Sequence, residues 1–294
     1  MSKNVNVIFL YKIMQCEYID GFSKGNFYFS CCGNWIDIAK KSGGKGQGDR
    51  YEGVFAKYLK KNSRKPIRKY KRKFGKDLIV ESDGDFILLR RKSSLKIPAI
   101  CFYSIDSDTI KEFFPETEKE RIEKILDENN GLDEITVDKF PLGLSEKYLS
   151  EFNLDSEKID AVTIQPRNVL GQFDKEGIYY HKVIYIDMNY EFDIFNDELY
   201  KKFGLSLCEA IDNHIEIFFK DRANYSHQCE LRAIVNTERL KSIRRGITKQ
   251  INGLSYINVN NSESKPVNAT GKDLICYTKS TSGGLYGRVV LKKL

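Results

Sequence analysis

Residues 97–105 read IPAICFYSI, a nearly continuous apolar run with the length of one strand. A strand that is apolar on both faces must be covered on both sides, so we expect it to be central and buried. Further strands are predicted where β-branched and aromatic residues gather, over residues 5–13, 26–32, 160–165, 179–190 and 230–235. Residues 77–81 and 85–91 flank an Asp83-Gly84 turn and predict a hairpin.

Helical patterns lie between these strands. They cover residues 15–23, 118–126, 144–152, 166–174 and 199–219, of which the last is the longest and is amphipathic. Residues 42–50 read as a glycine-rich loop, and three short strands are expected at 255–259, 274–277 and 287–291. Strands and helices do not alternate regularly, so we expect an α+β fold. The prediction is a single domain over 1–294 with a mixed, mainly antiparallel central sheet flanked by helices, a basic insert or loop at 57–76, and a strand-rich C-terminal extension at 237–294.

The composition excludes several classes of protein. The chain has 294 residues, of which 41% are hydrophobic, which is enough for a packed core and argues against overall disorder. No window approaches the roughly 18 apolar residues of a membrane helix, and the first residues lack a signal peptide. Its seven cysteines and three histidines show no metal-ligand spacing. We therefore expect a cytoplasmic protein with no metal site and no membrane partner.

The positive charge is concentrated in one segment. The formal net charge is +7, yet residues 57–76 hold eleven Lys and Arg and no acid, so the remainder carries −4. Interleaved aromatic residues suggest stacking on bases beside contacts to phosphates of RNA or DNA. The alternative is a solvated loop. The candidate nucleic-acid-binding residues are Arg64, Lys65, Arg68, Lys69, Tyr70, Lys71, Arg72 and Lys73.

A second polar segment precedes the last predicted strand of the central sheet. Alternate residues of a strand share a face, so Gln228, Glu230 and Arg232 should project together. An amide, a carboxylate and a guanidinium on one face favour a functional site. The alternative is an edge strand with a weak surface pair between Glu230 and Arg232.

Five segments occur in an order that resembles a known family. They are Tyr11-Lys12, residues 25–30 (GNFYFS), residues 48–52 (GDRYE), the strand at 100–105, and residues 218–232 with Lys220, Gln228, Glu230 and Arg232. This order is similar to that of the bacterial proteins called the domain-of-unknown-function 2971 group, over roughly residues 8–236. Residues 48–52 depart from the family's Asn-Asp-Pro-Phe-Glu, and Gln228 replaces its first Glu.

The same layout also resembles ADP-ribosyltransferases. The resemblance implies that Glu230 is the catalytic carboxylate and that Gln228 orients the acceptor. It implies that Ser30 braces Glu230 or the ribose, and that Tyr28 or Phe29 stacks on nicotinamide. NAD would be held by Tyr11, Lys12, Lys220 and Arg232, although the first strand lacks the family's Arg or His.

Three functions follow as expectations. The first is an ADP-ribosyltransferase-like effector that uses NAD to modify a macromolecule, in toxin or phage-defence conflict. The second is a non-enzymatic nucleic-acid-binding or regulatory protein that depends on residues 57–76. The third is a metal-dependent nuclease that uses Asp49, Glu52 and Glu230.

Overall fold

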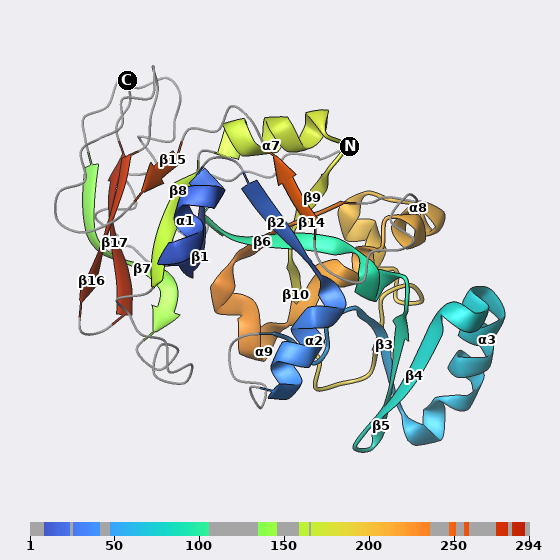
Figure 1. Cartoon of the computed structure of the whole chain (residues 1–294). Helices are drawn as coiled ribbons and strands as arrows, with labels where there is room; N and C mark the ends of the chain where they lie inside the picture. The colour runs from blue at the N-terminus through green and yellow to red at the C-terminus, as the bar shows by residue number, and fades with distance from the viewer. Residues whose placement is uncertain are drawn as a thin grey trace.

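The computed structural model describes residues 9–23, 26–41, 48–105, 135–145, 159–164, 166–235, 247–250, 256–258, 275–281 and 284–291. The fold is α+β, with mainly antiparallel sheets and a few helices, as predicted (Figure 1). The prediction of one central sheet is wrong, because the strands form separate sheets.

The predicted central strand is β6 (Pro98–Ile105), and it is paired along both edges. One edge pairs with β13 (Glu230–Ile234). The other edge is shared, because β2 (Asn26–Cys31) pairs with the start of β6 and β1 (Phe9–Gln15) pairs with its end. The outer strands of this sheet are β8 (Ile159–Ile164), β9 (Tyr179–Lys182), β14 (Ile247–Gln250) and β15 (Tyr256–Asn258).

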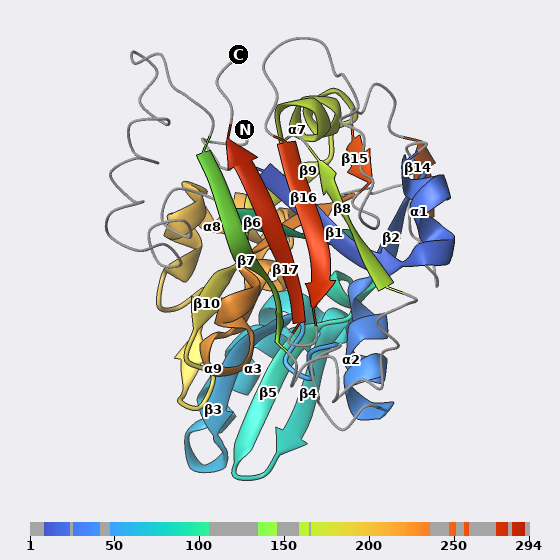
Figure 2. The same ribbon diagram turned by 90° about the vertical axis from the view of Figure 1, so that its left-hand side faces the viewer.

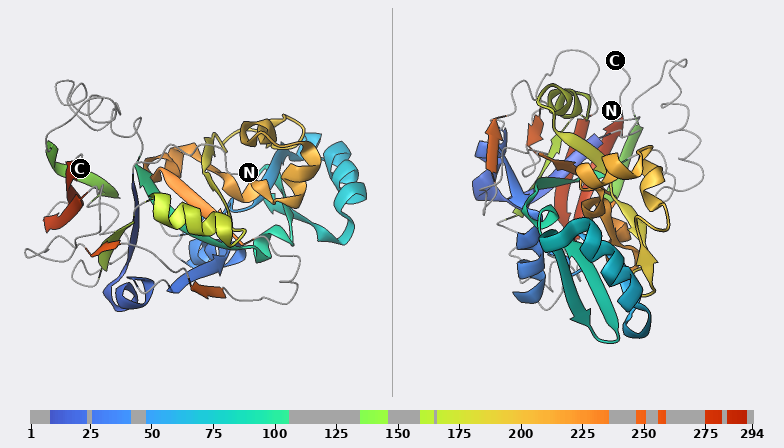
Figure 3. Two further views of the ribbon diagram at one scale, coloured as in Figure 1. Left: turned by 90° about the horizontal axis from the view of Figure 1, so that it is seen from above. Right: turned by 90° about the vertical axis from the view of Figure 1, so that its right-hand side faces the viewer.

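One face of this sheet carries an apolar core. The helices α1 (Cys16–Ser23) and α7 (Pro166–Lys175) contribute side chains to it (Figure 3). Phe22 of α1 stacks on Phe27 at 4.3 Å, and Phe173 of α7 lies among Phe29 and Phe102. Because β13 alternates, Leu231 and Ala233 join this core, while its polar residues belong to the other face.

A second, four-stranded sheet supplies part of the other apolar core. Its order is β11 (Phe192–Asp193), β3 (Val54–Leu59), β5 (Phe86–Arg91) and β4 (Leu78–Asp83). The predicted hairpin is confirmed as β4 and β5. After β5 the 3₁₀ turn η3 (Ser94–Lys96) leads the chain into β6, so these strands do not extend the β6 sheet.

The basic segment is not a loop. It contains the end of β3, the turn η1 (Lys60–Asn62), the helix α3 (Arg64–Phe74) and the turn η2 (Gly75–Asp77). Pro66 lies in the first helical turn, where its missing N–H removes no intrahelical bond. Gly75 ends the helix at φ +56°, and its N–H donates to Lys71 O. The aromatic residues on its inward side pack against the core and hold the helix in place. Because charged residues dominate the segment, this amphipathic pattern is difficult to recognise in the sequence.

Two smaller sheets complete the described part of the chain. The strand β10 (Ile184–Ile186) runs parallel to β12 (Phe219–Asp221). The strands β7 (Ile135–Ser145), β16 (Ile275–Thr281) and β17 (Gly284–Leu291) form an antiparallel sheet (Figure 2). Residues 237–294 therefore supply β14 to β17, and two of these strands join the β6 sheet.

The predicted long helix over 199–219 is wrong. Its residues form the turn η5 (Leu199–Phe203), the helix α8 (Leu207–Asp212), the turn η6 (Ile215–Phe218) and the start of β12. Gly204 takes φ +67°, and Ser206 begins α8 with a capping box to Glu209. His214, at φ +50°, then breaks the pattern again.

Residues 33–41, to which the sequence assigned no element, belong to α2 (Cys32–Lys41), and most of the predicted glycine-rich loop at 42–50 lies outside the described residues. The short amphipathic pattern of α2, with Ile36 and Ala39 buried, is masked by the neighbouring glycines. The α9 turn (Arg222–Tyr225) and η7 (Ser226–Gln228) precede β13. The predicted helix at 118–126 lies outside the described residues, as does most of the one at 144–152, whose first two residues belong to β7.

Among the helices in the part of the chain that the structure describes, none is long and apolar enough to cross a membrane.

Candidate functional sites

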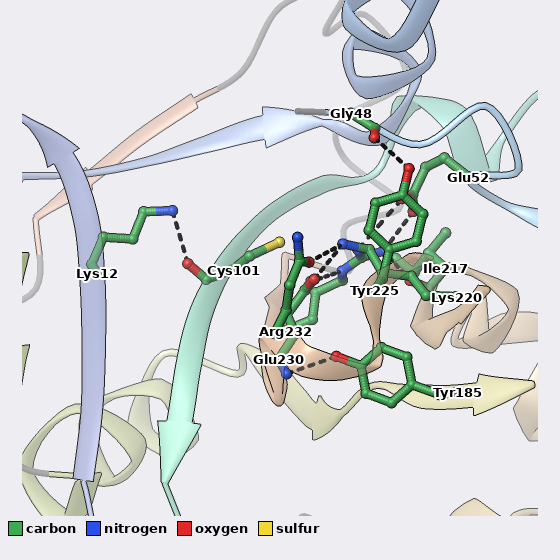
Figure 4. Close-up of polar contacts among 11 residues, drawn as sticks. Lys12, Gly48, Glu52, Cys101, Tyr185, Ile217, Lys220, Tyr225, Glu230 and Arg232 are labelled. Carbon is green, nitrogen blue, oxygen red and sulfur yellow. Dashed lines mark hydrogen bonds and ion pairs between the residues drawn. The ribbon is translucent and has the colours of Figure 1, made fainter. Parts of the chain in front are cut away.

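The polar face of β13 carries a buried arginine that joins two distant parts of the chain (Figure 4). Arg232 is 0% exposed. Its Nη1 lies 2.5 Å from Glu52 Oε1, and its Nε donates to Glu230 Oε1 at 2.8 Å. Its Nη1 also donates to Ile217 O, and the guanidinium lies 4.6 Å from the Trp35 ring centroid. Arg232 therefore ties β13, α2, η6 and the 48–53 turn together.

Lys220 completes this cluster from β12, a strand that pairs with β10 and not with β13. Its Nζ lies 2.5 Å from Glu230 Oε2 and 3.2 Å from Gln228 Oε1. The sequence predicted Gln228, Glu230 and Arg232 on one strand face. Gln228 instead ends η7, and Cys229 at φ +43° turns the chain into β13. The three side chains still meet, because Lys220 bridges the first two and Glu230 the last two.

The 48–53 turn brings two more carboxylates to the cluster, Asp49 at 1% and Glu52 at 0% exposure. Gly48 fixes the turn: its carbonyl accepts from Tyr225 Oη at 2.9 Å, and its φ is +83°. A Cβ at this glycine would lie 2.2 Å from Trp35 O, so the turn packs against α2 with no space for a side chain. Asp49 Oδ1 accepts from Tyr51 N at 2.7 Å, and its Oδ2 is buried with no hydrogen-bond partner among the described residues.

These buried charges have shifted pKa values. Burial alone would raise the pKa of Glu230, but the charges of Arg232 and Lys220 outweigh it and lower that pKa to about 2. Burial raises the pKa of Glu52 to about 7, against the opposing charge of Arg232. Burial also raises the pKa of Asp49, while Lys220 opposes the rise. At neutral pH Glu230 is a fixed anion, and Glu52 is the group whose charge changes most readily.

The first strand contributes a lysine near this cluster. Lys12 Nζ donates to Cys101 O at 2.8 Å. That carbonyl lies on the stretch of β6 between its pairings with β2 and β1, so the lysine supplies a donor where the ladder is interrupted. The register also places Tyr11 opposite Tyr103, which lies opposite Glu230. The expected proximity of the first strand to Glu230 is thus present in the backbone.

The pairing register of the second strand separates Ser30 from Glu230. Ser30 lies opposite Ala99, four residues along β6 from Tyr103 and hence roughly 13 Å from the row of Glu230. Its hydroxyl accepts from Asn34 Nδ2 at 3.3 Å at the start of α2. The prediction that Ser30 braces Glu230 is therefore wrong, because the pairing register separates them. Tyr28, on the same strand, is 54% exposed.

Two of the three carboxylates of the proposed nuclease site pair with Arg232. Glu52 and Glu230 both pair with this guanidinium, so a cation of the protein already lies between them. Within the described ranges no group of three His, Cys, Asp or Glu is arranged to hold a metal ion. The geometry gives the metal-dependent nuclease no support.

Sequence reasoning missed a second buried polar cluster. Arg91 pairs with Glu216 at 2.6 Å, and Ser94 Oγ contacts both Glu216 and, at 2.9 Å, His214 Nδ1. These residues are too scattered in sequence to form a recognisable motif. Ser94 is 0% exposed, and the acid and the histidine both contact its hydroxyl instead of forming a relay. The cluster joins η3 to η6 and does not resemble a nucleophile site.

The basic helix α3 presents its cations to solvent. Its exposed residues are Arg64, Lys65, Arg68, Lys69, Lys71, Arg72 and Lys73. No carboxylate within the described residues forms an ion pair with any of them; Lys69 donates to Asn196 Oδ1 at 3.1 Å. This face is called the α3 basic face below.

The aromatic residues of this segment do not share that exposure. Tyr70 is 1% exposed and donates to both carboxylate oxygens of Asp193 at 2.7 Å. Its ring stacks on Phe74 and contacts Phe55 edge-on, with centroids 5.8 and 4.9 Å apart. The prediction that Tyr70 contacts nucleic acid is therefore wrong, because its ring and hydroxyl attach α3 to β3 and β11.

Comparison of the chain with protein-family models, with curated proteins and with solved structures finds no match. We therefore infer a function from the residues of this chain.

Proposed function

We propose that this protein binds nucleic acid through the α3 basic face. The proposal rests on one observation: the whole exposed arc of a well-formed helix is cationic, and no acid interrupts it. A phosphate backbone offers the complementary charge, and neutralising it releases counterions, which drives binding.

The charge arrangement is costly for the helix itself. Like charges four residues apart destabilise a helix, and α3 has them at Arg64/Arg68, Lys65/Lys69, Arg68/Arg72 and Lys69/Lys73. Arg64 and Lys65 also lie at the N-terminal end, where the helix dipole disfavours cations. A solvated helix selected only for stability would place acids at some of these positions. The uniform charge supports binding to a polyanion.

The test compares two variants that each remove four positive charges. One replaces Arg64, Lys65, Arg68 and Arg72 by Gln, which has a similar helix propensity. The matched control replaces Lys40, Lys41, Lys96 and Lys175, which are exposed on α2, η3 and α7. We expect the α3 variant to lose at least tenfold in affinity for a DNA or RNA mixture at low salt. Equal affinities of the two variants would disprove the proposal.

A second candidate function is NAD-dependent ADP-ribosyl transfer at Glu230. It is favoured by the ionised state of Glu230 beside Gln228, both held by Lys220. In this reaction the nicotinamide–ribose C–N bond breaks, and nicotinamide leaves with the bonding electrons. The acceptor then bonds the ribose carbon and loses its proton to solvent, while the carboxylate stabilises the positive ribose.

Burial sets a condition on this second candidate. Glu230 is 4% exposed and both its oxygens are paired, so NAD must displace Lys220 to reach it. The unfolding midpoint of the wild type should then rise in millimolar NAD, by mass action, and the rise should vanish in Glu230→Gln. An unchanged wild-type midpoint would exclude NAD binding and leave the nucleic-acid proposal untouched.

A further inference from the structure

We infer that α3 binds in the major groove of double-stranded DNA and contacts the backbones of both strands. This inference rests on the proposed function, since it presupposes that the α3 basic face binds nucleic acid. It adds the form of the nucleic acid and the way in which the helix lies against it.

The first argument is that α3 offers no base-stacking platform. Proteins that bind single strands combine cations with exposed aromatic rings on which bases stack. The aromatic residues of α3 point inward: Tyr70 is buried, and Phe74 packs on Phe55 and Phe195. Its exposed side chains are therefore suited to phosphates and groove edges.

The second argument is the distribution of charge around the helix. With 3.6 residues per turn, successive residues are separated by about 100°. Arg64 and Lys71 then lie on one flank of the exposed arc, and Lys69 and Lys73 lie on the opposite flank. The ridge between the flanks carries Lys65, Arg68 and Arg72. A single strand supplies one line of phosphates, whereas a groove supplies one on each side of the helix.

The third argument is size. A helix of 11 residues is about 16 Å long and roughly 10–12 Å wide with side chains. The major groove of B-form DNA, about 12 Å wide, admits such a helix. The major groove of A-form RNA is too deep and narrow for side chains to read. In the views of Figures 1 and 3, α3 lies at an extremity of the molecule, with its outer side turned away from the sheets. The geometry therefore favours DNA.

An anionic membrane would be the other polyanionic surface. Helices that bind membranes bury an exposed apolar face at the interface. The apolar residues of α3, Ile67, Tyr70 and Phe74, pack instead against the protein core. Only electrostatic attraction would then bind α3 to a lipid surface. The helix therefore matches the major groove of DNA better than a membrane.

The experiment measures binding of the full chain to three fluorescent probes of one 20-nucleotide sequence: duplex DNA, duplex RNA and single-stranded DNA. We expect duplex DNA to bind at least tenfold more tightly than the other two at equal salt. Vesicles with phosphatidylserine serve as a fourth probe and should compete poorly. Equal or tighter binding of single strands, duplex RNA or vesicles, if still lost in the four-Gln α3 variant, would overturn the inference for duplex DNA.

Two paired variants test the two-sided contact. Arg64→Gln with Lys71→Gln removes one flank, and Lys69→Gln with Lys73→Gln removes the other. Each pair should weaken binding to duplex DNA and reduce the salt slope by about 2. An effect of only one pair would show one-sided contact and contradict the groove geometry. If the four-Gln α3 variant binds all probes as the wild type does, the proposed function itself fails.

Discussion

At the scale of single residues, substitutions are most restricted in the buried cluster around Arg232. The carboxylates of Glu52 and Glu230 pair with Lys220 and Arg232 with almost no exposure. Buried ions lose their hydration, so a cluster of this kind is stable only while its members stay paired. It therefore has a structural role, whatever chemistry it also performs.

Glu230→Gln should lower the free energy of unfolding by about 3 kcal/mol, because it leaves Lys220 and Arg232 buried without their shared anion. Urea unfolding monitored by tryptophan fluorescence measures this loss. Glu198→Gln is a control, since its carboxylate is 55% exposed and its partner Lys201 is 61% exposed. A loss below about 0.5 kcal/mol at Glu230 would contradict the cluster.

Glu52 should make the free energy of unfolding depend on pH over a different pH range than Glu230 does. The pKa of Glu52 is raised to about 7 in the folded state, so folding favours its protonated form. Relative to Glu52→Gln, the wild type should gain stability as the pH falls from about 7 to about 4.5. The pKa of Glu230 is lowered to about 2, so relative to Glu230→Gln the wild type should lose stability from about pH 4.5 towards 2. A difference between wild type and Glu52→Gln that is constant over pH 4.5–7 would refute the raised pKa.

At the scale of elements, the sequence predicted strands better than helices. The continuous apolar run of β6 and the Asp-Gly turn between β4 and β5 are local signals, and both are confirmed. The amphipathic pattern over 199–219 failed because Gly204 and His214 take positive φ values that periodicity does not reveal. The charge of residues 57–76 favours a loop, but Tyr70 and Phe74 have the helical spacing that places both rings against the core.

Tyr70→Phe should destabilise the protein by about 2 kcal/mol, because the hydroxyl donates to the buried carboxylate of Asp193. The unfolding midpoint measures this loss, and Tyr190→Phe, at a side chain 70% exposed, is the neutral control. Below the midpoint, the DNA affinity of the Tyr70→Phe protein should equal that of the wild type. A selective loss of affinity without a loss of stability would mean that Tyr70 contacts nucleic acid.

At the scale of the whole molecule, long-range pairing brings the candidate residues together. The sequence identified Lys220, Gln228, Glu230 and Arg232 as one group, and the structure joins them in one cluster. It could not show that Glu52 and Trp35 complete the cluster, since these contacts span most of the chain. Nor could it place Ser30, because proximity depends on the register of β2 on β6.

At this scale the protein also keeps two groups of charged residues apart, one buried and one exposed. The buried cluster balances its charges inside the molecule, while α3 exposes cations that no described carboxylate pairs with. The two features are therefore independent, and changes to α3 should leave the stability contributed by Arg232 intact.

The most direct test of the central claim is the salt dependence of duplex DNA binding. Wild type and the variant with Arg64, Lys65, Arg68 and Arg72 changed to Gln would be titrated between roughly 50 and 200 mM salt. The account predicts a steep linear fall of log affinity with log salt for the wild type, and a slope shallower by about 3–4 for the variant. The control with Lys40, Lys41, Lys96 and Lys175 changed should keep the wild-type slope. Identical slopes for the wild type and the α3 variant would contradict the account.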